Sequence, residues 1–483
     1  MKNSSKMFRF GGFTVILTAV VLGILVLVNV LYGNLPSSVT QFDISRNSLS
    51  KISDATKQIV TALDEDVTIH ILCETGQEIS GEDGTVISTM LDRYADLSDH
   101  IHVDHLDPNT APNLRKDYDI SGSIYYYSMI VESARRSRYI PLRSTAPTQG
   151  VYVTYIDYDN YDTSAGDYAK YEQFEAERAI TSAIDYVTKD EIPMMYRLTG
   201  HGEYEIYDTL KAELTAKNIG MEDLALETAG QIPDDCAVLL LYSPSNDFNE
   251  NERDAILDYA KKGGKILLVA QDQGIEMPNF TAVTDFFDME MTPGIVFEGN
   301  SDYYSAYYGA YFLMPKIRSH KITDSLIDAS YRVALPYASA IKAKNSDADT
   351  TVTALLTTSS SAYIKALDTK TLEKEDGDIS GAQTLALLAE KAATESGDVP
   401  TMVWLTSGYA LDCTDANVNL TTNIVNYLVG EIKGIAISAK TNDTSFLVVS
   451  GVQSTIWTII IAGVLPALVL AVGIFVVVRR RRK

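Results

Sequence analysis

The turn formed by Gly200, His201, Gly202 and Glu203 has the residue types and spacing that most directly suggest chemistry in this chain. It follows a predicted strand at residues 194–198 and precedes a predicted helix. In open α/β sheets, ligands bind at the carboxyl ends of strands, and glycines let a ligand approach backbone N–H groups at a helix N-terminus. His201 and Glu203 could also exchange a proton. We therefore take these four residues as candidate ligand-binding residues.

The same turn also has a structural interpretation. Gly200 and Gly202 can satisfy turn geometry, and Glu203 can favour the positive end of the following helix. The motif by itself identifies no reaction. No G-x-S-x-G elbow, P-loop or dinucleotide fingerprint occurs in the sequence. We therefore predict that the chain is not an enzyme, and we name no catalytic residue.

Two other groups of residues allow a functional and a structural interpretation. His100, His102 and His105 lie in HIHVDHLD, where His100 and His102 share one strand face and His105 points away. A solvated strand end is favoured, so we predict no metal site and no cofactor. The tyrosine-rich residues 303–312 could offer aromatic platforms to a sugar or peptide, but alternating aromatics also fit a half-buried strand pair, and we favour packing.

Cysteines are few and far apart in the chain. Cys73, Cys236 and Cys413 form no paired spacing, which argues against a disulfide framework and a zinc site. Cys73 and Cys236 lie in apolar runs, so we predict that they are buried packing residues.

Alternating helix and strand patterns predict two α/β units that position these residues. The first unit contains predicted helices at 49–64, 85–96 and 169–190 and predicted strands at 67–72, 101–105, 125–131 and 151–156. The second contains predicted strands at 194–198, 236–244, 265–270 and 401–405 and predicted helices at 204–217, 249–262 and 417–429. Asn249 and Glu252 have the spacing of a capping box, and the strands on either side of that helix should be parallel.

Both ends of the chain are strongly apolar. Residues 13–32 and 456–478 contain no charged side chain and have the length of a bilayer core, so we predict two transmembrane helices. Lys2, Lys6 and Arg9 precede the first segment, and residues 479–483 are all basic, which places both termini in the cytoplasm. A cleaved signal peptide is the alternative for the first segment, but its apolar run is long and no cleavage site follows.

The charge between these segments limits the classes of partner. Eight of the 40 Lys and Arg residues lie at the ends, so 40 − 8 = 32 face 64 Asp and Glu in the middle, a balance of about −32. Such a surface repels nucleic acid, which we exclude as a partner. The expected partners are protein subunits, the lipid bilayer through the two helices, and a small-molecule or glycan ligand.

Several segments together resemble one family. Along the chain the order is a terminal apolar helix, QFDISRNSLSKISDATKQIVTAL, LDRYADLSDHIHVDHLDPNTAPNL, FEAERAITSAIDYV, YRLTGHGE, VLLLYSPSNDFNENERDAILDYAKKGGKILLV and a second apolar helix. With these segments in this order, the chain resembles the GldG-like auxiliary proteins of ABC transporters. The resemblance implies an extracytoplasmic accessory subunit that works with a separate ABC permease and ATPase.

The second unit also resembles the intraflagellar-transport-type domain, which is similar to class I glutamine amidotransferase and flavodoxin-like folds. Those enzymes carry a nucleophilic cysteine in a Gly-x-Cys-x-Gly elbow, whereas the strand exits here read LLLYSPSND and LLVAQDQGI. Amidotransferase chemistry is therefore not expected.

The leading hypothesis is a membrane-anchored, noncatalytic auxiliary subunit of an ABC transporter in the bacterial cell envelope. The alternatives are an extracytoplasmic hydrolase or carbohydrate-modifying enzyme that uses His201 and Glu203, and a structural envelope scaffold. The expected segments are a cytoplasmic tail at 1–12, a transmembrane helix at 13–32, an α/β domain at 33–190, a second α/β domain at 191–430, a stalk at 431–455, a transmembrane helix at 456–478 and a cytoplasmic tail at 479–483.

Overall fold

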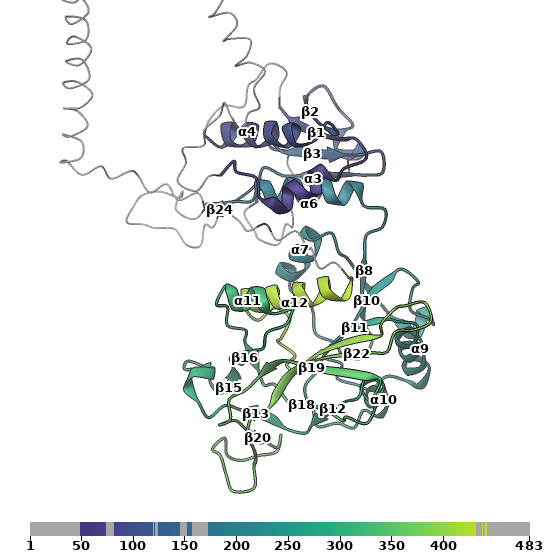
Figure 1. The fold of residues 1–483 in the computed structure, drawn as a ribbon, viewed down its shortest axis with the longest axis vertical. Coiled ribbons are helices and arrows are strands. Elements are labelled where there is room, and N and C mark those ends of the chain that lie inside the picture. Colours follow the sequence, from purple (N-terminus) through teal and green to yellow (C-terminus); the bar gives the residue numbers. More distant parts are fainter. Residues whose placement is uncertain are drawn as a thin grey trace, which may run out of the picture.

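A computed structural model describes residues 49–73, 82–118, 120, 124–144, 152–156, 172–430, 437 and 440–441. Its elements form a first α/β region, residues 49–188, and a second, residues 194–428 (Figure 1). The first region contains α3 (Asp54–Thr61), β1 (Val67–Leu72), α4 (Glu82–Leu97), β2 (Ile101–Leu106), α5 (Leu114–Asp117), β3 (Met129–Glu132), β4 (Ser137–Ile140), β5 (Arg143–Ser144), β6 (Thr154–Ile156), β7 (Glu172–Phe174) and α6 (Ala176–Thr188). A late strand, β24 (Lys440–Thr441), pairs with β7.

The main sheet of the first region has the order β2-β1-β3-β4. β1 is parallel to β2 and antiparallel to β3, so the sheet is partly parallel, as predicted. Alternate residues of β1, such as Val67 and Ile69, join one apolar core with side chains of α3, α4 and α6. Leu72 and Ile130 contribute to a smaller core with Leu114 of α5.

The second region begins with β8 (Met194–Leu198), α7 (Asp208–Ala216), β9 (Gly220–Leu224), α8 (Leu226–Ala229), β10 (Cys236–Tyr242), α9 (Glu250–Lys261), β11 (Lys265–Val269), α10 (Pro278–Phe286), β12 (Met289–Thr292) and β13 (Ile295–Phe297). It continues with η3 (Ser301–Tyr303), β14 (Tyr304–Ser305), β15 (Gly309–Leu313), β16 (Lys316–Ile317), α11 (Asp324–Asp328), β17 (Leu335–Pro336), β18 (Ala340–Ala343), β19 (Thr350–Thr357), β20 (Tyr363–Lys365), β21 (Ile379–Ser380), β22 (Thr384–Lys391), β23 (Thr401–Leu405) and α12 (Asp415–Leu428).

A ten-stranded mixed sheet forms the centre of the second region, with the order β12-β18-β22-β23-β11-β10-β8-β9 along its main path. The strands β9, β8, β10, β11 and β23 are parallel, and β22 starts the antiparallel part. α7 and α12 contribute to the core on one face, and α9 and α10 to the core on the other. The β10-α9-β11 crossover predicted from the sequence is present.

Local sequence explains why α9 begins where it does. The Asn249 side chain accepts from the backbone N–H of Glu252, and the Glu252 carboxylate accepts from the backbone N–H of Asn249, which completes the predicted capping box. At the end of the helix, a Cβ on Gly264 would lie 2.5 Å from the Tyr259 ring, so only glycine fits there. The Tyr259 hydroxyl then accepts from the N–H of Lys265 at 3.1 Å, which fixes the start of β11.

Polar contacts join the two regions through α6 and the end of α7, which lie next to each other in Figure 1. Arg178 of α6 donates to both carboxylate oxygens of Glu213 at 3.1 Å and to Glu175 at 2.8 Å. The Ser182 hydroxyl donates to the carbonyl oxygen of Ala216 at 2.6 Å. Ala216 itself packs into the core of the first region.

The membrane part of the sequence prediction is corrected by the structure. Among the residues that the structure describes, no helix combines the length and apolar composition needed to cross a bilayer. The longest of them, α4, has 16 residues and carries several charged side chains, whereas a span needs about 20 apolar residues. The two predicted spans, residues 13–32 and 456–478, lie outside the described residues. The structure therefore does not support the predicted two-pass topology and membrane localisation.

Candidate functional site

The predicted Gly200–Glu203 turn lies where the connections of the parallel sheet change direction. β8 is followed through α7 by β9 on one side, whereas β10 is followed through α9 by β11 on the other. The loops after β8 and β10 meet at this topological switch point. The backbone N–H groups of Ser245 and Asn246 donate to the carbonyl oxygen of His201 at 2.7 and 3.0 Å. This is the position where open α/β sheets commonly bind ligands.

His201 lies between two carboxylates, an arrangement that we call the histidine bridge (Glu203, His201 and Glu252). The Nδ1 atom of His201 is 3.1 Å from Oε1 of Glu203, and its Nε2 atom is 3.0 Å from Oε2 of Glu252. His201 is only 7% exposed. The second oxygen of Glu203 accepts from the backbone N–H groups of Gly200 and His201 at 3.0 and 2.9 Å.

The histidine bridge favours the imidazolium form of His201. A neutral imidazole has one N–H group, whereas both ring nitrogens here face a carboxylate oxygen. The hydrogen bond with Glu203 is the main reason that the pKa of His201 is raised, and Glu252 adds to the effect against burial, which lowers it. Burial works to raise the pKa of Glu203, but the bonds from His201 and the backbone outweigh it, and the pKa is lowered.

The polar groups of the turn already have hydrogen-bond partners within the protein. A general base must reach a substrate proton, but both ring nitrogens of His201 are already bonded within the protein. The backbone N–H groups of Gly200 and His201 donate to the Glu203 carboxylate. Gly202 has φ +78°, and a Cβ there would lie 3.2 Å from the Ser245 hydroxyl. The structure thus brings all four predicted residues together, in an arrangement that fixes the turn against α9.

Glu203 does not lie at the start of the following helix. The sequence predicts that the helix begins at residue 204, whereas α7 begins at Asp208. Because the Glu203 carboxylate turns back onto the N–H groups of its own turn, it is not available to the N-terminus of α7.

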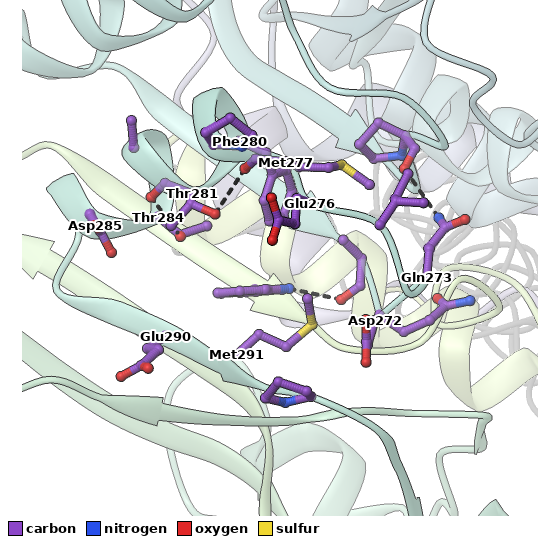
Figure 2. Close-up of a pocket in the computed structure, with 18 residues that line it drawn as sticks. Asp272, Gln273, Glu276, Met277, Phe280, Thr281, Thr284, Asp285, Glu290 and Met291 are labelled. Atoms are coloured by element: carbon purple, nitrogen blue, oxygen red, sulfur yellow. Dashed lines mark hydrogen bonds between the residues drawn. The ribbon is translucent and has the colours of Figure 1, made fainter. Parts of the chain in front are cut away.

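An open cavity of about 570 Å³ lies between α10, β12 and the residues that follow β10 and β11 (Figure 2). Its apolar lining includes Phe280, Met277, Met291, Ile275 and Trp404. Figure 2 shows Phe280, Met277 and Thr281 on one side of the space and Met291 on the other. The cavity therefore has the size and the largely apolar wall of a small-molecule site.

Distant parts of the chain fix the wall of the cavity. The indole N–H of Trp404, in β23, donates to the carbonyl oxygen of Ala270 at 3.0 Å. The carboxylate of Asp272 accepts from the N–H groups of Gly274 and Gly294 at 2.9 and 2.7 Å, which ties the loop after β11 to the chain after β12. Sequence reasoning missed this cavity, although the exit of the β11 strand was a signal that could have indicated it.

Aromatic contacts connect the histidine bridge to the cavity. The ring of His201 meets Phe248 edge to face, with centroids 5.2 Å apart. Phe248 contacts Phe280, and Phe280 contacts Trp404, with centroids 6.2 and 5.9 Å apart. The bridge thus holds one wall of the cavity in place through Phe248.

The other residues considered from the sequence lie away from this site. His100 pairs with Asp66 at 2.9 Å, and His105 is exposed on β2. Within the described part of the chain, no three metal-ligating side chains lie close enough together to hold a metal ion. Cys73 and Cys236 are buried, as predicted, and burial raises the pKa of the Cys236 thiol to about 11.

The tyrosine-rich segment forms the antiparallel pair of β14 and β15, as predicted, and β17 completes this small sheet. Its rings make ordered contacts: Tyr308 stacks on Phe312 with centroids 4.5 Å apart, and Tyr311 stacks on Tyr337 at 4.6 Å. Tyr307 is nevertheless 87% exposed. The predicted packing role therefore holds for part of the segment only.

Comparison with known proteins gives no family for this chain. No family model and no curated protein matches it. Among solved structures, the "mmIFT52 N-terminal domain" is 12% identical with a TM-score of 0.35, and the match covers 49% of this chain and 96% of that one. PurLQS from Thermotoga maritima is 11% identical with a TM-score of 0.24, covering 49% of this chain and 100% of that one. At these scores neither likeness carries an argument about function.

Proposed function

We propose that this chain is a noncatalytic binding subunit that takes a small ligand into the cavity of its second α/β region and works with a separate ABC permease and ATPase. The observation that carries the binding role is the cavity of about 570 Å³ at the carboxyl ends of β10 and β11. Ligand sites in proteins commonly enclose about 300–1,000 Å³ and occupy this edge of parallel sheets.

Two features support a noncatalytic role. The acid and base groups of the predicted turn are bonded to one another in the histidine bridge, which leaves neither ring nitrogen of His201 for a substrate. The sequence contains no P-loop, so ATP hydrolysis would come from another subunit. The partnership with a transporter rests on the resemblance to GldG-like proteins in segments such as YRLTGHGE and YAKKGGKILLV.

Tryptophan fluorescence tests the binding role. The sequence has two tryptophans, and Trp457→Phe leaves Trp404, which lines the cavity, as the only one. Titration of this full-length variant with a small-molecule library should find compounds that change the Trp404 emission. Thr281→Phe should abolish the response, because residue 281 lies in the cavity wall.

Thr215→Phe provides a matched control. Both threonines are exposed helix residues whose hydroxyl donates to the carbonyl oxygen four residues earlier, Thr281 at 2.8 Å and Thr215 at 2.9 Å. If every responding compound binds Thr281→Phe as well as it binds Thr215→Phe, the cavity is not the ligand site.

Affinity purification tests the transporter partnership separately. A tagged full-length chain, cross-linked and purified from the cells that produce it, should bring down a permease and an ATPase. Their repeated absence would exclude the transporter role but would leave the binding role intact.

A further inference from the structure

The charge of the cavity wall points to a class of ligand. The ionisable side chains that line the cavity are all carboxylates, namely Asp272, Glu276, Asp285 and Glu290, and its lining contains no Lys, Arg or His. Figure 2 shows these four side chains arranged around the space between α10 and β12. We propose that the cavity binds a small organic cation with an apolar body, an inference that rests on the proposed binding function.

Nearby lysines balance only half of this charge. Asp285 pairs with Lys344 at 2.9 Å, and Glu290 pairs with Lys342 at 3.4 Å. The oxygens of Asp272 accept from backbone N–H groups, which carry no formal charge. Four carboxylates less two lysines leave a net charge of −2 at the wall.

Glu276 is the group best placed to meet a ligand. It is exposed, and within the described part of the chain no cationic side chain forms an ion pair with it. Figure 2 shows its carboxylate directed into the space toward the side of Met291. A cation in the cavity could therefore pair with Glu276 without displacing an internal partner.

The N-terminus of α10 could attract an anion, but a carboxylate of the protein already occupies it. A helix N-terminus favours negative charge, and α10 starts at the cavity wall. The Asp247 carboxylate accepts from the N–H groups of Asn279 and Phe280 at 2.9 and 2.8 Å, so it occupies this position. A phosphate or carboxylate ligand would find neither a basic side chain nor a free helix end in this wall.

The apolar lining selects an organic cation rather than a bare metal ion. Among the described residues no group of three His, Cys, Asp or Glu side chains could hold a metal. Phe280 lines the cavity, and aromatic faces attract organic cations. Met277 and Met291 supply flexible thioether side chains that adapt to the shape of an apolar group.

Calorimetric titration of the full-length chain with three matched probes tests the inference. The probes are benzyltrimethylammonium, benzyl alcohol and 3-phenylpropionate, which share an aromatic body but differ in charge. We expect the cation to bind at least tenfold more tightly than the other two, and its affinity to fall as NaCl is raised from 50 to 500 mM. Glu276→Gln should weaken cation binding about threefold to fivefold, the factor expected for one exposed ion pair.

Two variants separate the possible failures. Glu395→Gln removes an exposed carboxylate outside the cavity and should leave the affinity unchanged. If the neutral or anionic probe binds as tightly as the cation and Thr281→Phe abolishes this binding, the cation class is wrong but the cavity remains a ligand site. If no probe binds, and no compound changes the Trp404 emission, both the cation class and the proposed binding function are refuted.

Discussion

Replacing His201 by glutamine removes the cation between Glu203 and Glu252. The wild-type ring makes two charge-assisted hydrogen bonds, of 3.1 and 3.0 Å, to carboxylate side chains that are 6% and 4% exposed. Glutamine carries no charge and can donate to only one of them. Removal of one partner from a buried ion pair costs about 3–5 kcal/mol. Because Glu203 keeps two backbone N–H bonds and Glu252 keeps one, we expect a loss of about 3 kcal/mol of unfolding free energy.

The histidine bridge also predicts how stability depends on pH. The pKa of His201 is raised above its ordinary value of 6.5, so its contribution is complete below that value and is lost as pH rises through the folded pKa. The pKa of Glu203 is lowered from 4.5, so its contribution is present above that value and is lost as pH falls through the folded pKa. The bridge should therefore stabilise most between pH 4.5 and 6.5.

Urea unfolding of the full-length chain measures both effects. We propose to follow Trp404 emission in a Trp457→Phe background at pH 5.5 and 8.5, because Trp404 contacts the bridge through Phe248 and Phe280. The difference between His201→Gln and its parent should be larger at pH 5.5 than at pH 8.5. His105→Gln, at an exposed position of β2, serves as the control for loss of a histidine.

A small effect would refute this reasoning. If His201→Gln costs less than about 1 kcal/mol at pH 5.5, or keeps the pH dependence of its parent, the imidazolium is not held by both carboxylates. The ring of His201 would then be free to act on a substrate, and the hydrolase alternative would gain support.

Other substitutions test the packing around the site and between the regions. Arg178→Met should cost about 3 kcal/mol, since it leaves Glu213 and Glu175 without their cation, and differential scanning calorimetry should then separate the transitions of the two regions. Gly408→Ala should lower the free energy of unfolding by about 1–3 kcal/mol, and the melting temperature with it, because a Cβ there would lie 2.8 Å from the Tyr204 ring. Asn249→Ala should cost about 1 kcal/mol in urea unfolding through loss of the α9 capping box.

Local patterns predicted the elements that end at the site but not the contacts between them. The capping box of Asn249 and Glu252 could be read from a spacing of three residues, and it is present. The second role of Glu252, as a partner of His201, joins positions 51 residues apart. No periodicity or cap signal carries that information, because the contact depends on how β8 and α9 pack in three dimensions.

The cavity was missed for the same physical reason. Trp404 reaches it from β23, and its hydrogen bond to Ala270 spans 134 residues. The sequence between residues 294 and 356 looks strand-like but irregular, and it folds into short strands, such as β13, β16 and β18, that pair with distant partners. The burial of these strands depends on their distant partners. Each strand is also too short for the alternation of its apolar and polar residues to predict the sheet.

The place of β23 in the sheet has a consequence for synthesis on the ribosome. β11 pairs with β23 along its whole length, but residues 270–400 separate the two strands in the chain. At an elongation rate of about 5–20 residues per second, that edge of β11 would wait roughly 7 to 26 s for its partner. During this time the unpaired edge of an apolar strand can pair with other nascent chains. We therefore expect chaperone binding to matter most between the synthesis of β11 and that of β23.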